Sequence, residues 1–150
     1  MQTTADQLTV QPPQASQPAF DKHFLGLMEH YHSVHAVNLL GQKDAEAMLS
    51  AAYSDHLESL KRTLERMPES EKAEMQAKPH GDLSLTPYDF HASVRTSGTE
   101  GVKYDFSSRL SEVVRSMDDF GWTAVDTATG QIVERQNGVF RVNCLDWCVT

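Results

Sequence analysis

Apolar residues recur at helical spacing in three stretches of the chain. The first follows Pro18, which favours the first turn of a helix, and the second is a leucine stripe at steps of three and four. The third is opened by Asp105 or Ser107 as a cap and closed by Gly121. The apolar positions of the three helices are Phe20, Phe24, Leu27, Met28 and Tyr31; Leu49, Tyr53, Leu57, Leu60 and Leu64; and Phe106, Leu110, Val113, Val114, Met117 and Phe120.

Short apolar runs between these helices predict strands. They lie at residues 35–40, 83–90, 122–125, 131–134 and 139–142. The first run is stopped by Gly41 and suits a buried strand, and Pro87 interrupts the second. Thr129 and Gly130 predict a hairpin turn. Helices interspersed with short strands indicate an α/β layered domain.

Polar stretches separate these elements and set the domain boundaries. Residues 1–17 are rich in Gln, Thr and Pro and predict a disordered leader, because so few apolar residues cannot offset the entropy of ordering. Residues 69–80 are charged and predict an exposed connection, and Ser97, Gly98 and Gly101 predict a loop. The folded domain is expected over residues 18–150.

Composition excludes several functional classes. The chain has 150 residues, enough for one domain with a core, and a net charge of −8, which argues against a general nucleic-acid binder. No apolar run approaches the length of a transmembrane segment, and no basic stretch followed by an apolar block and a small-residue cleavage site predicts a secretory signal. The two cysteines, Cys144 and Cys148, provide no disulfide framework. A cytoplasmic protein is expected, with peripheral membrane association as an open alternative.

The strand-like residues 139–142 run directly into the sequence Asn-Cys-Leu-Asp, which begins at Asn143. A cysteine just after a strand is a position for a nucleophile. In cysteine-dependent phosphatases the thiolate lies in a loop of inward-pointing N–H groups followed by a helix N-terminus, which lower the thiol pKa and bind phosphate. An arginine at the end of the loop then holds the phosphoryl oxygens. Cys144 is therefore a candidate nucleophile.

Several runs of the sequence resemble one family in fixed order. FRVNCLD is similar to the start of the signature R-x-N-C-x-D-C-L-D-R-T-N of the Sac-domain phosphoinositide phosphatases. QPAFDKHF, AVNLLGQKDAEAMLSAAYSDHL, YDFH and NGVF resemble other parts of synaptojanin-like Sac domains. The resemblance implies a mixed, partly parallel sheet between helices. It also implies chemistry that needs no metal or other cofactor, with phosphatidylinositol phosphates at a cytosolic membrane face as substrates.

The resemblance also implies roles for individual residues. Cys144 matches the family nucleophile, and Asp146 matches the first loop aspartate, a candidate for proton transfer to the leaving inositol oxygen. Arg141 and Asn143 match the residues that precede the nucleophile and are candidates for substrate binding.

The sequence departs from the family pattern after Asp146. The pattern continues Cys-Leu-Asp-Arg-Thr-Asn, whereas this chain reads Trp-Cys-Val-Thr, with Thr150 at the place of the arginine. Loss of a phosphate-clamping charge costs about 10³–10⁵ in rate, so an incomplete, inactive phosphatase is expected. Two explanations stay open: intron read-through at the codon of Trp147, or a genuine short isoform that acts as a protein-binding or decoy module.

Structural roles compete with these functional ones. Cys144 is alternatively an unreactive thiol, and with Cys148 it supplies only half of a tetrahedral zinc site. Asp89 and His91 of YDFH share a face of the expected strand, which favours a hydrogen-bonded structural pair over acid–base chemistry. Surface or capping roles are expected for the histidine cluster and a solvated surface for three cations: His30, His32 and His35; Arg95, Lys103 and Arg109.

Overall fold

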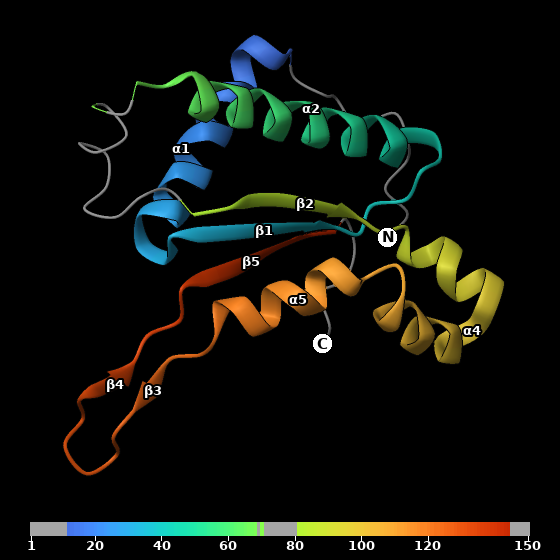
Figure 1. The fold of residues 1–150 in the computed structure, drawn as a ribbon. Coiled ribbons are helices and arrows are strands. Elements are labelled where there is room, and N and C mark those ends of the chain that lie inside the picture. Colours follow the sequence, from blue (N-terminus) through green and yellow to red (C-terminus); the bar gives the residue numbers. More distant parts are fainter. Residues whose placement is uncertain (1–11, 69, 71–80, 145–150) are drawn as a thin grey trace, which may run out of the picture.

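The computed structural model describes residues 12–68, 70 and 81–144. Its centre is a parallel sheet in the order β2-β1-β5, formed by β1 (Ser33–Asn38), β2 (Leu83–Pro87) and β5 (Gly138–Asn143). Figure 1 shows the three strands running in one direction, so their carboxyl ends share one edge of the sheet. With its helices and a small antiparallel hairpin, the chain has the α/β class and the partly parallel strand arrangement expected from the sequence.

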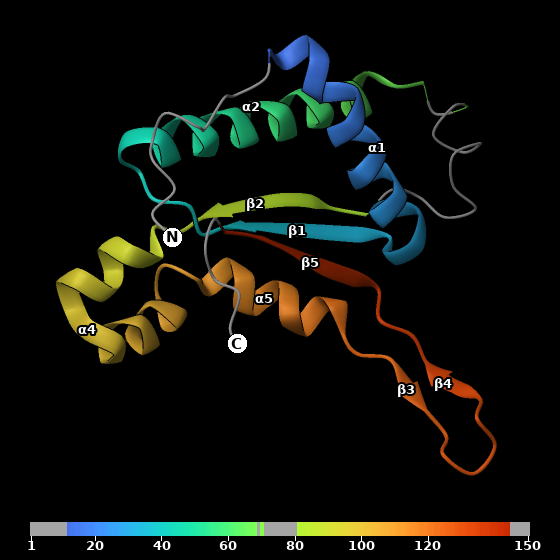
Figure 2. The same ribbon diagram turned by 180° about the vertical axis from the view of Figure 1, so that it is seen from behind.

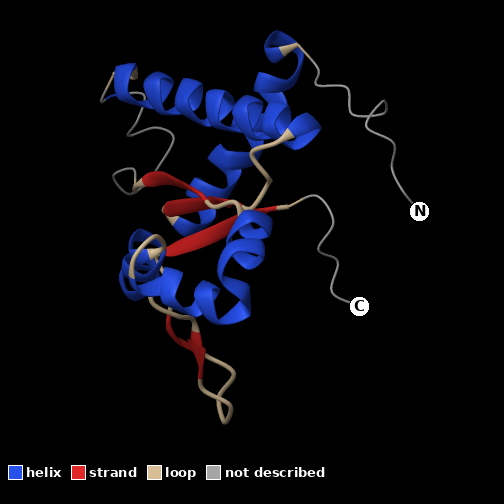
Figure 3. Ribbon diagram, turned by 90° about the vertical axis from the view of Figure 1, so that its right-hand side faces the viewer, coloured by secondary structure: helices blue, strands red, loops and turns tan. Residues whose placement is uncertain are grey.

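Helices lie on both faces of this sheet. One face is covered by α1 (Pro13–Tyr31) and α2 (Asp44–Arg66), and the other by α5 (Ser111–Phe120), with α4 (Phe90–Ser107) beside it (Figures 1 and 2). Seen edge-on in Figure 3, the sheet separates the two sets of helices. The hairpin of β3 (Ala124–Val125) and β4 (Ile132–Glu134) projects away from them.

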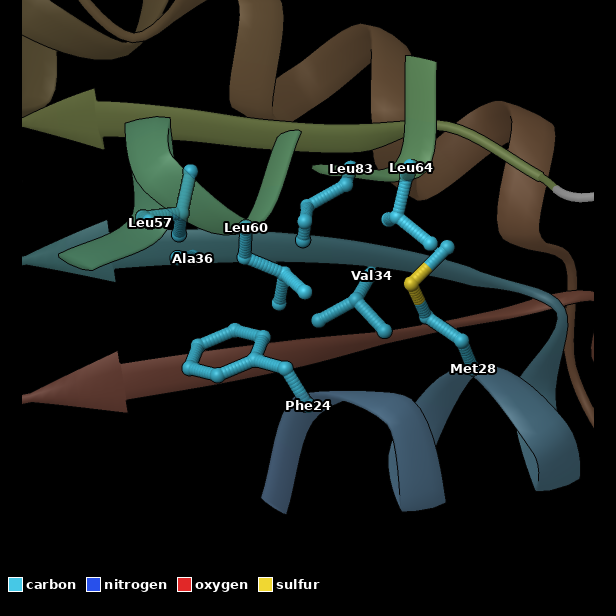
Figure 4. Packing of buried hydrophobic residues seen from close by; sticks show 8 residues of the cluster. All are labelled: Phe24, Met28, Val34, Ala36, Leu57, Leu60, Leu64 and Leu83. Atoms are coloured by element: carbon cyan, nitrogen blue, oxygen red, sulfur yellow. The ribbon is translucent and has the colours of Figure 1, made fainter. Parts of the chain in front are cut away.

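The leucine stripe of α2 supplies three of the eight buried residues of the larger apolar cluster, Leu57, Leu60 and Leu64, as its spacing predicts. Figure 4 shows how α1 and α2 place their buried side chains against one face of β1 and β2. Alternate strand residues point to the same face, which is why Val34 and Ala36 join this cluster. Its members are Phe24, Met28, Val34, Ala36, Leu57, Leu60, Leu64 and Leu83.

A second apolar cluster lies on the opposite face and holds α5. It contains Val37, Tyr88, Leu110 and Val113, with Phe140 packed against it. His35 is on this face too and is only 1% exposed. Its Nδ1 lies 2.7 Å from Ser116 Oγ and its Nε2 lies 2.8 Å from Thr86 Oγ1. The surface role expected for this histidine is therefore wrong, since the central strand carries its ring into the interior.

Helix α1 begins at Pro13 rather than at Pro18, which lies inside the helix. Proline is also well suited to position 13, because the first helical N–H has no partner within a helix. The extended end is anchored on α2: Gln17 Nε2 donates to the carbonyl of His56, and Ser16 Oγ lies 2.9 Å from His56 Nε2. Residues 13–17 are thus helical, and residues 1–11 of the expected leader lie outside the described residues.

The loop expected around Ser97 is instead part of α4. The helix is interrupted at Gly98, whose φ of 64° lies in the left-handed region, and it continues to Ser107. Asp105 therefore lies within α4 and does not cap α5. The strand expected over residues 83–90 ends at Pro87, because α4 begins three residues later. Apart from residue 70, the charged connection at 69–80 lies outside the described residues.

Candidate functional site

The carboxyl edge of the parallel sheet is where the candidate site lies. The last residues of the three strands are in register, with Asn38 of β1 opposite both Pro87 and Asn143. From β1 the chain passes through α2 to β2 on one side, and the later connection through α5 leads to β5 on the other side. The carboxyl ends of β1 and β5 therefore meet at a topological switch point, the usual place for a ligand crevice in an open α/β sheet.

Asn143 is held at this edge by Asn38. Asn143 Nδ2 donates to Asn38 Oδ1 (3.2 Å), and Asn38 Nδ2 donates to Ser50 Oγ of α2 (2.8 Å). The peptide N–H of Leu39 donates to the carbonyl of Asn143 (2.8 Å), which continues the pairing beyond the end of β1. The side chains of Asn38 and Ser50 are buried, so this polar cluster links the interior of the protein to the end of β5.

Cys144 follows Asn143 directly and is an exposed free cysteine. Arg141 shares a strand face with Asn143, but its guanidinium is engaged elsewhere: Nε donates to His23 Nε2 of α1 (3.2 Å) and Nη1 donates to the carbonyl of Val142. The structure thus groups Asn143 with Cys144 at the strand end and Arg141 with α1. Asp146, the expected proton donor, lies outside the described residues.

Asp89 fastens the loop after β1 to the start of α4. Its carboxylate accepts hydrogen bonds from the peptide N–H of Ala92 (2.8 Å), as a helix cap, and of Gln42 (3.0 Å). Burial alone would raise the pKa of Asp89, but these hydrogen bonds and the charges of Arg95 and His91 outweigh it and lower the pKa. The expected pairing of Asp89 and His91 on a strand is wrong, because position 89 caps a helix and its hydrogen bonds go to the backbone.

Two of the three surface cations have partners along the α4–α5 segment. Lys103 is exposed and pairs with Glu100 (2.9 Å). Arg109 lies 3.5 Å from the carboxylate of Asp105 and donates to Ser93 Oγ (3.0 Å). The hydrogen bond from Tyr88 is the largest of the effects that lower the pKa of Asp105.

Sequence reasoning missed Asn38, Ser50 and Gln42. Ser50 Oγ also accepts a hydrogen bond from Gln42 Nε2 (3.1 Å), so all three residues belong to the same polar cluster. An available signal was the amide of Asn38 within the apolar run His-Ala-Val-Asn-Leu-Leu, because a polar side chain in a buried strand requires a partner.

Over residues 12–68, 70 and 81–144, no three His, Cys, Asp or Glu side chains are grouped closely enough to hold a metal ion. Within the same ranges, every helix is too short or too polar to cross a bilayer.

Comparison with known proteins identifies the family. The SacI homology domain matches residues 2–95. The chain is 33% identical to polyphosphatidylinositol phosphatase INP53 of Saccharomyces cerevisiae over 133 residues, which is 89% of this chain and 10% of the yeast protein. It is 34% identical to synaptojanin-1 of Rattus norvegicus over 134 residues, 89% of this chain and 7% of that protein.

The chain therefore spans about a tenth or less of the length of these curated relatives. No solved structure matches it significantly. The SacI match extends over more than half of the chain, and the similarity to both relatives extends over most of it. On this evidence the chain belongs to the SacI homology domain family.

Proposed function

We propose that this chain carries the nucleophile of a phosphoinositide phosphatase, with Cys144 as the attacking residue. The observation that supports the proposal is the position of Cys144 immediately after β5, at the switch point of a parallel sheet. Its relatives include proteins named as a polyphosphatidylinositol phosphatase and as synaptojanin-1. Phosphatidylinositol phosphates at a cytosolic membrane surface are the substrates that this membership favours.

The proposed reaction has two steps. The thiolate of Cys144 attacks phosphorus, forming an S–P bond as the P–O bond to the inositol breaks, and Asp146 gives a proton to the leaving oxygen. Water then attacks phosphorus and gives a proton to the Asp146 carboxylate, the S–P bond breaks, and inorganic phosphate leaves with the thiolate of Cys144 and the acid form of Asp146 restored. Asn143 and Arg141 are the proposed contacts for the headgroup, and Arg141 would have to exchange its partner His23 for the substrate.

The 150-residue chain itself is proposed to be inactive, because Thr150 stands where the family signature has its arginine. That guanidinium would donate two parallel hydrogen bonds to the phosphoryl oxygens. A comparable arginine in phosphoryl transfer raises the rate by about 10³–10⁵-fold. A thiol without this partner can still be present and exposed, as Cys144 is, and yet give no turnover.

Transcript reads across the codon of Trp147 test this proposal first. We expect a spliced message that restores the family signature through its arginine. The product of that message should release phosphate from vesicles containing phosphatidylinositol phosphates, and Cys144→Ser should abolish the release. The 150-residue chain is the matched control and should release none. An inactive spliced product, or release that survives Cys144→Ser, contradicts the proposed function.

A second candidate is a protein-binding or decoy role for the short chain. It is favoured by apolar side chains that the hairpin region leaves open to solvent, because exposed apolar patches mark interaction surfaces. Trp122 is 67% exposed, Val125 52%, Ile132 44% and Val133 68%. Uninterrupted exon coverage to a stop codon after Thr150, together with a protein of 16.8 kDa in cells, would select this candidate over the catalytic one.

A further inference from the structure

We propose that Asn38 is a positioning residue that fixes the end of β5 and, through Asn143, the place of Cys144. The inference rests on the proposed function of Cys144. Asn38 is the last residue of the central strand and is 0% exposed. It is in register with Asn143, the residue that immediately precedes the thiol.

The carboxamide of Asn38 uses both of its ends. Its nitrogen donates to Ser50 Oγ of α2 (2.8 Å). Its oxygen accepts from Asn143 Nδ2 (3.2 Å) and from the peptide N–H of Leu40 (3.4 Å). One side chain therefore joins β1, β5, α2 and the loop after β1, and Cys144 begins where this cluster ends.

Packing alone gives no reason for an amide at this position. The two preceding residues on the same face of β1, Val34 and Ala36, are apolar and belong to the core. Burying an amide costs free energy unless its hydrogen bonds are made, so a polar residue here is useful for the partner that it fixes. The partner on β5 is Asn143, which points to a role in placing the segment that carries the thiol.

Ser50 extends the same restraint to the loop that faces the site. Its hydroxyl oxygen accepts from Asn38 Nδ2 and also from Gln42 Nε2 (3.1 Å), while the peptide N–H of Gln42 donates to Asp89. The start of α4 and the loop after β1 are thereby connected to Asn38. In a reaction that depends on placement, an error of about 1 Å costs about 10²-fold in rate.

Hydrogen exchange on the 150-residue chain tests the restraint. The N–H of Leu39 bonds to the carbonyl of Asn143 at the carboxyl end of the strand pair, and the N–H of Ser33 bonds to the carbonyl of Asn137 at the other end. In Asn38→Leu, we expect exchange at Leu39 to quicken about tenfold or more, with Ser33 changing less than about twofold. Equal acceleration at both amides, or none at Leu39, would overturn the proposal.

A second variant guards against failure of Asn38→Leu to fold. Asn143→Ala removes the same hydrogen bond from a half-buried position and should give the same local acceleration at Leu39. The double variant should add little to Asn38→Leu, because that substitution already breaks the hydrogen bond that Asn143→Ala removes. Leu64→Ala is the control: it opens a cavity in the core on α2 and should affect both amides alike.

Kinetics of the spliced product test the consequence for catalysis. Asn38→Leu should lower kcat by about 10²-fold because the thiol is misplaced, and KM should rise by a smaller factor, because Asn143, through which Asn38 acts, is also a proposed headgroup contact. An unchanged kcat in an otherwise active product overturns the positioning role while the proposed function stands. Failure of the proposed function is recognised separately, by the absence of phosphate release from the unsubstituted spliced product.

Discussion

His35 lies in the central strand between two hydroxyl groups, Ser116 on α5 and Thr86 on β2. Burial lowers the pKa of its imidazole below the ordinary value, and the negative charges of Glu112 and Asp82 offset only part of this effect. The unfolded chain takes up this proton near pH 6.5, whereas the folded chain takes it up only at lower pH. The contribution of His35 to stability is therefore complete above about pH 6.5, and it is lost as the pH falls from there through the lower pKa of the folded chain.

We expect the unfolding free energy to fall with acidification, at most about 1.4 kcal/mol per pH unit from this one group. His35→Gln stays uncharged and should have a weaker dependence between about pH 7.5 and about pH 5.5. Urea denaturation at the two values measures the difference. A His35→Gln curve that follows the unsubstituted chain would refute the assignment.

The course of helix α4 is determined by its N-terminal cap and by the bend within it. Asp89 caps the start by accepting from the peptide N–H of Ala92, and Gly98 allows the bend with a φ of 64°. The sequence around Gly98 and Gly101 resembles a loop because glycine disfavours helices, yet a single left-handed residue between two helical segments satisfies the same sequence.

Removing the cap should destabilise the protein. Asp89→Ala loses the hydrogen bonds from Ala92 and Gln42, for which we expect a cost of about 1–2 kcal/mol. Asp89→Asn keeps an accepting oxygen and should lose less. Urea denaturation of the two variants measures this order, and equal losses would show that the capping oxygen is not what stabilises this end.

The left-handed glycine can be tested against another helical glycine. A Cβ at Gly98 or at Gly26 would meet no atom within 4 Å, so the two sites differ mainly in backbone conformation. Gly98→Ala should cost about 1–3 kcal/mol because of its positive φ. Gly26→Ala, inside α1, should stabilise by up to about 1 kcal/mol. Thermal unfolding that gives both substitutions the same sign would contradict the assigned bend.

At the scale of the whole molecule, two apolar clusters hold the helices to opposite faces of a narrow sheet. The cluster of α1 and α2 is the larger, and Leu60 is at its centre with 1% exposure. Since the net stability of a domain is about 5–15 kcal/mol, loss of one such side chain is a large fraction of the total.

Leu60→Ala should lower the unfolding free energy by about 2–5 kcal/mol, because it removes apolar contacts and leaves a cavity. Met48→Ala on the same helix is the control: this side chain is 58% exposed, and the change should be within about 0.5 kcal/mol. Chemical denaturation compares the two. Similar losses for both would mean that α2 does not pack through the face assigned here.

The elements that sequence predicts well are those whose pattern is local. The leucine stripe of α2 confirms this, because its spacing alone predicts that Leu57, Leu60 and Leu64 are buried. The strand predicted over residues 139–142 is also present, as β5. The start of α1 was missed because its anchor is distant: Gln17 bonds to His56 on another helix. The helix predicted to start at Pro18 is present, but its first residue is Pro13.

The candidate site likewise contains a part that the sequence predicts and a part that it does not. Cys144 is a candidate because its flanking residues resemble a family signature, which one sequence displays directly. The contact of Asn38 with Asn143 joins residues 105 positions apart, and Ser50 adds a third element. No periodicity or motif in a single sequence encodes such a pairing, which exists only after the sheet has assembled.

The hairpin of β3 and β4 has a consequence for engineering. Its base is closed by the N–H of Asn137, which donates to the carbonyl of Phe120 (2.7 Å), and the turn between β3 and β4 stands clear of the parallel sheet (Figure 1). Exposed loop tips accept foreign polypeptide with little disturbance elsewhere. A fluorescent reporter could be grafted at this turn, giving a tagged protein with both termini left free.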